Sequence, residues 1–179
     1  MSPGIPEKIN TIFNNKTVRK VLLRCRYPLF FAFALLTLAH IKREWFIPAI
    51  VVSFAGTCIQ CWCFATLEKN KVICWKGPYL LVRNPMYIGR YLVLFGFLLL
   101  PGNIWILILF TILYYFYMVN RVQREESKLK SMFGEAYEEY CNKVNRFMPS
   151  LKNYDHKQFF QFCLTTFLRN NGHWNFTLV

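Results

Sequence analysis

The stretch that decides the fold runs from Gly77 to Asn103 and reads "GPYLLVRNPMYIGRYLVLFGFLLLPGN". Its apolar run extends from Pro85 to Leu100 and stops at the turn-forming residues 101–103. Proline fits the first turn of a helix, where its missing N–H is no loss, so we predict a helix that begins at Pro85 with Asn84 as its N-cap. Arg90 lies inside this apolar run, and a charge there needs a partner or a task.

The composition places this stretch in a membrane protein. Of the 179 residues, 55% are hydrophobic and 18% are aromatic, which is more apolar surface than a soluble domain of this size can bury. The net charge of +13 comes mainly from basic residues that flank the apolar runs. The positive-inside rule accounts for that placement, so we expect an integral membrane protein that binds membrane lipids and no nucleic acid.

Four apolar runs stand out, at residues 27–41, 45–67, 85–100 and 104–119. A membrane span needs about 20 apolar residues, so the first, third and fourth runs require flanking residues or tilt to cross. We predict an all-α, polytopic membrane helical bundle with about four spans. The basic residues of segments 1–26 and 68–84 and of the chain after Val119 place these segments on the cytoplasmic side.

The third and fourth runs are joined by a short turn, so they are expected to form a C-terminal antiparallel helical hairpin. Equal rise per residue on both sides of the turn sets Arg83–Tyr87 level with Val119–Arg121. The motifs "RNPMY" and "RVQREE" should therefore meet at one membrane face. We predict that the fourth helix continues as a cytoplasmic extension to about Phe133 and is followed by a short helix, Glu135–Cys141. The segment Gln158–Leu168 is predicted to be a short interfacial or re-entrant helix.

The polar residues gathered by this hairpin are carboxylates, guanidinium groups and aromatic rings. The sequence supports neither a serine triad nor a glycine-rich phosphate loop, and it predicts no metal site. The seven cysteines read as small, buried, reduced side chains. Carboxylates can hold ribose hydroxyls or an amino group, aromatic rings can flank a sulfonium, and arginine can hold a substrate carboxylate. That set suits methyl transfer from S-adenosylmethionine, in which the enzyme mainly positions the reactants.

The blocks "GPYLLVRNPMYIG", "REE", "FGEAYEEY" and "RFMPSL" occur in this order between about Lys71 and Leu151. Here the chain resembles the superfamily of isoprenylcysteine carboxyl methyltransferases and phospholipid methyltransferases, which are membrane enzymes. The resemblance implies one domain, with a two-span region at 1–67, a cofactor-binding region at 68–151 and a tail at 152–179. It also implies an active site facing the cytoplasm, in a bacterial inner membrane or the endoplasmic reticulum.

The resemblance implies a pocket for S-adenosylmethionine and an arginine, Arg121, that orients the acceptor. The residues implied to bind the cofactor are Lys71, Val72, Ile73, Cys74, Tyr79, Asn84, Pro85, Met86, Tyr87 and Glu125. Many members of the superfamily carry histidine where this chain has Asn84. Asparagine keeps hydrogen bonding but lacks the titratable ring, so the implied role of Asn84 is cofactor binding and not acid–base chemistry.

The expected activity is methylation of a lipophilic acceptor at the cytoplasmic face, with an isoprenylcysteine-like carboxylate favoured because it needs no general base. Rival interpretations are N-methylation of a phospholipid amine, a sterol-reductase-like enzyme and a non-catalytic membrane scaffold. Several of these residues could also have purely structural roles. Arg121 and Glu125 could form only a helix-surface pair. Arg90 could only extend to the membrane surface, and Arg146 could contact lipid headgroups. The sequence does not indicate an oligomeric state.

Overall fold

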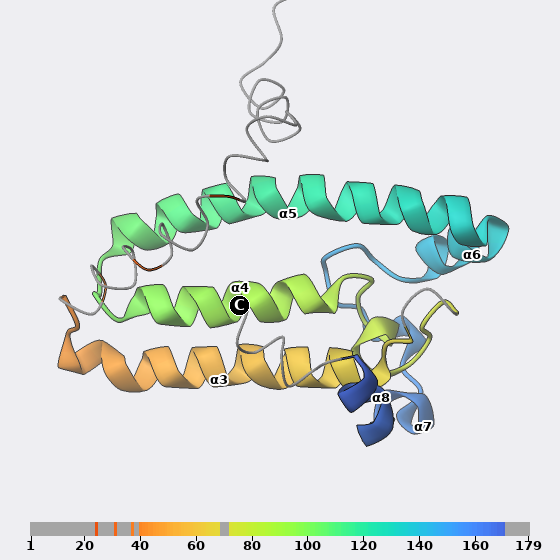
Figure 1. The fold of residues 1–179 in the computed structure, drawn as a ribbon, viewed down its shortest axis with the longest axis horizontal. Coiled ribbons are helices and arrows are strands. Elements are labelled where there is room, and N and C mark those ends of the chain that lie inside the picture. Colours follow the sequence, from red (N-terminus) through yellow and green to blue (C-terminus); the bar gives the residue numbers. More distant parts are fainter. Residues whose placement is uncertain (1–23, 25–30, 32–36, 38–39, 69–71, 171–179) are drawn as a thin grey trace, which may run out of the picture. The chain divides into compact units, whose positions relative to one another are not determined.

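The computed structural model describes residues 24, 31, 37, 40–68 and 72–170. The longer helices are α3 (Arg43–Thr66), α4 (Pro85–Leu99), α5 (Ile104–Phe133) and α6 (Glu135–Lys143) (Figure 1). The shorter ones are the 3₁₀ turns η1 (Gly77–Leu80) and η2 (Leu151–Asn153) and the helices α7 (His156–Phe159) and α8 (Leu164–Arg169). Every regular element in these described ranges is a helix, so the predicted all-α class is confirmed.

Two helices, α3 and α5, are long and apolar enough to cross a membrane, and α4 is a shorter apolar helix of 15 residues. Both long helices expose large apolar side chains, among them Ile47 and Phe54 on α3 and Trp105 and Leu109 on α5. Such side chains suit contact with lipid. Most of the first predicted span, Tyr27–Ile41, lies outside the described residues, so the predicted total of four spans stays a prediction.

The local signals placed the ends of the helices well. Helix α4 begins at Pro85, as predicted. Helix α5 ends at Phe133, just before Gly134, whose φ of 54° is a backbone conformation that glycine adopts readily. Helix α6 starts at Glu135 as predicted and runs two residues beyond the predicted end, to Lys143. At the start of α5, the side chain of Asn103 accepts a hydrogen bond from the N–H of Trp105 at 3.0 Å.

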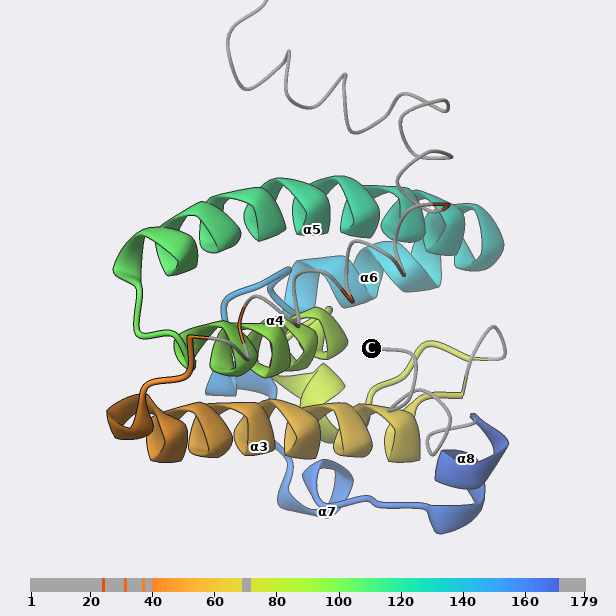
Figure 2. The ribbon, with the colours of Figure 1, turned by 60° about the vertical axis from the view of Figure 1, so that its left-hand side comes forward.

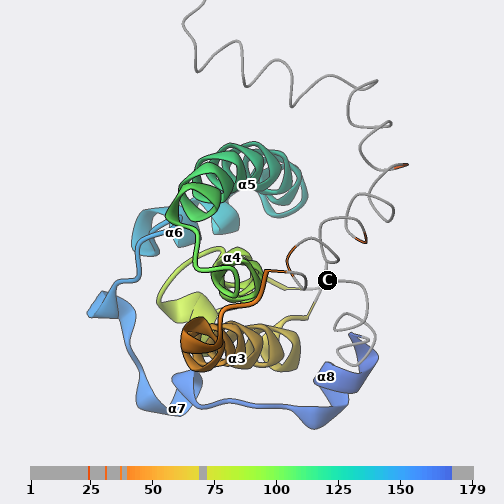
Figure 3. The same ribbon diagram turned by 90° about the vertical axis from the view of Figure 1, so that its left-hand side faces the viewer.

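The chain forms two compact units, and the first combines residues 1–51 with 95–125. Its core contains Ala49, Leu98, Leu99 and Leu107, from the start of α3, the end of α4 and the start of α5. Seen end-on, the turn between α4 and α5 lies beside the link into α3 (Figure 3), where the N–H of Lys42 donates to the Leu100 carbonyl at 3.0 Å. Gly102 in this turn has φ 60° and leaves room for the Trp45 indole.

The second unit combines residues 52–94 with 126–179. Within it α3 and α4 pack through glycines. A Cβ atom placed on Gly56 would lie 2.6 Å from the Gly89 carbonyl oxygen, and one placed on Gly89 would lie 2.9 Å from the Gly56 carbonyl oxygen. The Ser53 hydroxyl donates to the Val93 carbonyl at 3.3 Å in the same contact. Small residues let two apolar helices approach this closely, as is common in membranes.

The tail of the second unit wraps the C-terminal end of α3 (Figure 2). The Trp62 and Phe159 rings meet edge to face with centroids 4.6 Å apart. The Asn170 side chain donates to the carbonyls of Phe64 and Leu67 at 2.9 and 2.6 Å, which satisfies backbone acceptors that the end of a helix leaves open.

Two sequence expectations for this unit are wrong. The segment 158–168 is not one helix, because α7 ends at Phe159 and α8 begins at Leu164. The reason is tertiary: the N–H of Cys163, between them, donates to the Ala65 carbonyl of α3 at 3.3 Å. The cysteines are also not uniformly buried. Cys63 is buried, whereas Cys58 and Cys163 are exposed.

Candidate active site

The loop before α4 is shaped by a glycine at its start. Gly77 has φ 57°, and a Cβ atom at this position would lie 2.6 Å from Cγ2 of Thr66. Only glycine meets both conditions, so the chain can turn tightly into η1 and bury Tyr79. The backbone carbonyl of Tyr79 accepts a hydrogen bond from the Tyr140 hydroxyl of α6 at 2.8 Å. This bond ties the loop to α6.

A second tie joins the loop to the segment after α6. The N–H of Arg83 donates to the Asn145 carbonyl at 2.9 Å, and the N–H of Ser150 donates to the Leu81 carbonyl at 2.9 Å. These two bonds hold the "RNPMY" motif and the "NRFMPS" segment side by side. As a result, Arg83 and Asn84 lie next to Arg146, which is 62 residues away from Asn84 in sequence.

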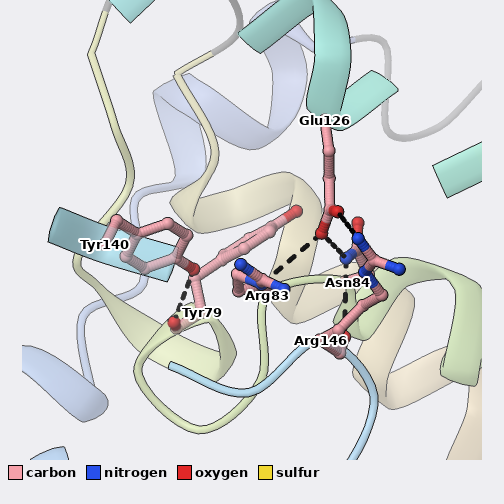
Figure 4. A network of polar contacts seen from close by, with 6 residues as sticks. All are labelled: Tyr79, Arg83, Asn84, Glu126, Tyr140 and Arg146. Atoms are coloured by element: carbon pink, nitrogen blue, oxygen red, sulfur yellow. Dashed lines mark hydrogen bonds and ion pairs between the residues drawn. The ribbon is translucent and has the colours of Figure 1, made fainter. Parts of the chain in front are cut away.

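The Glu126 carboxylate of α5 is the centre of this arrangement (Figure 4). Its Oε2 lies 2.6 Å from a terminal nitrogen of Arg146, and its Oε1 lies 3.4 Å from Nε of Arg83. The Asn84 amide donates to Oε1 at 3.2 Å and to the Arg146 carbonyl at 3.4 Å. We call these four residues, Arg83, Asn84, Glu126 and Arg146, the Glu126 cluster.

The Glu126 cluster is mostly buried and carries a net positive charge. The Arg83 and Glu126 side chains are 11% and 10% exposed, whereas Arg146 is 43% exposed. Two guanidinium groups face one carboxylate, so one positive charge is left over. The Arg83 contact is an ion pair without hydrogen-bond geometry, because Nε of Arg83 is buried with no hydrogen-bond partner among the described residues.

Two tyrosines beside the cluster are strongly shielded from water. Burial, together with the negative charge of Glu126, raises the pKa of Tyr137. Burial and the neighbouring thiols of Cys63 and Cys74 raise the pKa of Tyr79 well above its usual value. Both phenols therefore stay neutral at physiological pH.

Most of the predicted cofactor residues lie in the second unit, residues 52–94 with 126–179. Tyr79, Pro85 and Tyr87 are buried, Ile73, Cys74, Asn84 and Met86 are half-buried, and Val72 is exposed. The Cys74 thiol donates to the Thr66 carbonyl at 3.3 Å, and burial raises its pKa. Lys71 lies outside the described residues. Asn84 directly precedes Pro85, where α4 begins, so its role as the N-cap stays a prediction; its amide nitrogen donates to Glu126.

Arg121 and Glu125, the other two predicted site residues, belong to the first unit. Nε of Arg121 lies 3.0 Å from Oε1 of Glu125, and the two side chains are 49% and 43% exposed. This is the helix-surface pair that their spacing allows. A pair with this exposure contributes little to stability, so both groups can exchange partners at small cost.

Sequence reasoning grouped Glu126 with its neighbour Glu125 and did not assign it a role of its own. A periodicity signal was available. Val122, Glu126, Leu129 and Phe133 are spaced by three or four residues, so they share one face of α5. Three of them are apolar, and Val122 is fully buried, which indicates that the Glu126 carboxylate points inward with them.

Comparison with known proteins connects this geometry to a family. The family model described as phospholipid methyltransferase matches residues 49–136. The protein-S-isoprenylcysteine O-methyltransferase of Schizosaccharomyces pombe is 33% identical over 82 residues, which are 46% of this chain and 35% of the yeast protein. The probable protein-S-isoprenylcysteine O-methyltransferase of Oryza sativa subsp. indica is 26% identical over 160 residues, 77% of this chain and 83% of the rice protein.

The family model, which matches just under half of the chain, and these relatives support a likeness to the superfamily of isoprenylcysteine carboxyl methyltransferases and phospholipid methyltransferases. The match to this family model and the two apolar helices α3 and α5 in the described part of the chain support an integral membrane protein. The chain is also similar to the cobalt-zinc-cadmium resistance protein CzcN of Cupriavidus metallidurans, 24% identical over 180 residues, 95% of this chain and 82% of CzcN. No solved structure matches the chain.

Proposed function

We propose that this protein is an S-adenosylmethionine-dependent methyltransferase that methylates the carboxylate of a lipophilic, isoprenylcysteine-like acceptor. The observation that carries the proposal is the Glu126 cluster. It fixes the start of α4 from α5 and from the segment after α6, and three of its four residues lie within the range that the family model matches. Two relatives are named for O-methylation of isoprenylcysteine.

The residues present fit S-adenosylmethionine, which supplies a methyl group on a positively charged sulfur. The excess positive charge of the Glu126 cluster suits the cofactor's carboxylate. The neutral, buried rings of Tyr79 and Tyr87 suit its sulfonium and adenine. Glu125 offers a half-exposed carboxylate for its amino group or ribose hydroxyls.

The roles of the individual residues are part of the proposal. The cofactor would be held by Lys71 to Cys74, Tyr79, Asn84 to Tyr87 and Glu125. Arg121 would orient the acceptor, because its half-exposed guanidinium can leave Glu125 and take an acceptor carboxylate in the same planar geometry. Asn84, held by Glu126, would contribute hydrogen bonding and no proton transfer.

The charges near these motifs favour a carboxylate acceptor over an amine. Segments 83–90 and 121–126 together with Arg146 contain five arginines and two glutamates. An ammonium acceptor would be repelled by that excess, whereas a carboxylate would be attracted and would need no general base. Methylation of a phospholipid amine is the second candidate, and the family model's description supports it.

The membrane arrangement proposed with this function has four spans, a hairpin of α4 and α5, and a cytoplasmic site. The basic residues of 68–84 and of the chain after Val119 support it. The acceptor would then enter from the bilayer and the cofactor from the cytoplasm. A cysteine introduced at Lys76 should resist labelling by an impermeant thiol reagent added outside intact cells. Labelling from outside would reverse the orientation.

The function is tested on purified, membrane-reconstituted protein. Calorimetry should detect binding of S-adenosylmethionine, and Glu125→Ala should weaken that binding by about 1–3 kcal/mol through loss of a charge-assisted hydrogen bond. Glu135→Ala is the matched control, because Glu135 is an exposed glutamate on α6. Transfer of a labelled methyl group to a farnesylated N-acetylcysteine should follow. A folded protein that binds no cofactor would instead support the scaffold interpretation.

A further inference from the structure

Arg90 is the only charged residue of α4, whose sequence is "PMYIGRYLVLFGFLL". It lies five residues after Pro85, or about 7.5 Å along the helix axis. A charged side chain at such a position in a membrane protein is costly and usually has a function. The Glu126 cluster accounts for Arg83, at the start of this helix, but it does not account for Arg90.

The Arg90 side chain has an aromatic neighbour, and its Nε has no acceptor in the described part of the chain. Its central carbon lies 5.8 Å from the centroid of the Tyr87 ring. Nε of Arg90 is buried and has no hydrogen-bond partner within the ranges the structure describes. Arg83, whose Nε is also buried, has the Glu126 carboxylate at 3.4 Å. Nε of the half-buried Arg90 is therefore a buried donor whose partner has still to be identified, and such groups are rare in native proteins.

Burial of Nε bears on the interpretation that Arg90 only extends to the membrane surface. An arginine that merely extends to the membrane surface carries its whole charged head into water and buries only its aliphatic stem. The Arg90 head instead begins inside the protein, beside an aromatic ring. A cation–π contact compensates part of the charge, but it offers no in-plane acceptor for the N–H groups.

Helix geometry places Arg90 beside the proposed site. Successive residues turn by about 100°, so Arg90 shares a face of α4 with Met86 and Tyr87, four and three residues earlier. Both residues belong to the proposed cofactor-binding set. Gly89, on a different face, packs against Gly56 of α3. The Arg90 face is thus separate from the face that α3 occupies.

We propose that Arg90 and Tyr87 form a subsite that binds the carboxylate of the lipophilic acceptor. This inference rests on the proposed function and adds a second guanidinium to it. Nε of Arg90 has no hydrogen-bond partner among the described residues, so it can donate to a ligand. A planar guanidinium can bind both oxygens of a carboxylate, and Leu94, one turn further along α4, continues the same face with an apolar side chain for the acceptor's tail.

The test compares two ligands that differ only in charge, a farnesylated N-acetylcysteine and its carboxamide. Wild-type protein should bind the acid at least tenfold more tightly than the amide. Arg90→Gln should weaken binding of the acid about tenfold and leave binding of the amide within twofold, which removes the preference. Arg90→Lys should restore only part of it, because lysine lacks the planar fork. The control Arg43→Gln, at an exposed arginine at the start of α3, should keep the full preference.

Each result supports or overturns the subsite. A preference for the acid that survives in folded Arg90→Gln overturns it, and so does an equal loss for acid and amide, which would indicate a purely structural role. If Arg90→Gln does not fold, Arg90→Lys decides, and an undiminished preference in that variant overturns the proposal. Binding of S-adenosylmethionine is measured in parallel. Cofactor binding with no acid preference in the wild type rejects the subsite alone, and loss of both in the wild type rejects the proposed function as well.

Discussion

Replacing Glu126 by glutamine tests whether its charge holds the start of α4 in place. The substitution keeps the shape and a hydrogen-bond acceptor for Asn84, but it removes the counter-charge of Arg83 and Arg146. Arg83 is 11% exposed, so it would be left as a buried, uncompensated charge. Breaking a buried ion pair from one side costs about 3–5 kcal/mol. Arg146 is 43% exposed and can return to water, so its share is at most about 1 kcal/mol.

We therefore expect Glu126→Gln to destabilise the protein by about 3 kcal/mol, and Arg146→Gln by about 1 kcal/mol or less. At about 2–4 °C per kcal/mol for a chain of this length, the melting temperature should fall by roughly 6–12 °C in the first variant. Thermal unfolding in one detergent, at one scan rate, measures both. The double variant Arg83→Gln, Glu126→Gln should recover part of the loss. Equal shifts for Glu126→Gln and Arg146→Gln would refute the reasoning.

Two further predictions concern packing and pH. Gly56→Ala should destabilise by about 1–3 kcal/mol, because the added Cβ would meet backbone atoms of α4; the exposed neighbour Ala55→Ser should change the melting temperature little, and equal melting temperatures for the two variants would contradict the glycine contact. Burial raises the pKa of Tyr79 and Tyr140 above the ordinary value of about 10, so their contribution to stability is complete below pH 10 and is lost as pH rises further. Phenolate absorbance should then show a fraction of the tyrosines ionising only together with alkaline unfolding, and a single transition before unfolding would contradict it.

The parts of the fold that depend on local chemistry could be predicted from the sequence. Pro85 can start a helix but has no N–H to donate in a helix interior, which predicted the start of α4. Gly134 can adopt a positive φ, which predicted the end of α5. The long apolar runs likewise predicted helices rather than strands, since their lengths exceed those of ordinary strands.

The pairing inside the Glu126 cluster was harder to predict because it joins residues far apart in sequence. Asn84 has the local pattern of an N-cap, and nothing in that pattern indicates that its amide nitrogen donates to a carboxylate 42 residues later. From the sequence alone, Arg146 is as consistent with a lipid-headgroup contact as with an ion pair. Only the path of the chain after α6 brings it to Glu126. The break between α7 and α8 has the same origin, since a contact with α3 outweighs the local helical pattern.

The sequence distance between Asn84 and Glu126 also sets an order of events during synthesis. A ribosome adds about 5–20 residues per second, so the start of α4 emerges roughly 2–8 s before the carboxylate that will bind it. Asn170, whose side chain binds the carbonyl of Phe64 in α3, is made 106 residues after Phe64. During this interval the newly made loop carries Arg83 without its counter-charge. Chaperones or the insertion machinery would meet the protein in that incomplete form, and a stalled or truncated chain ending before Glu126 should be a preferred target of membrane proteases.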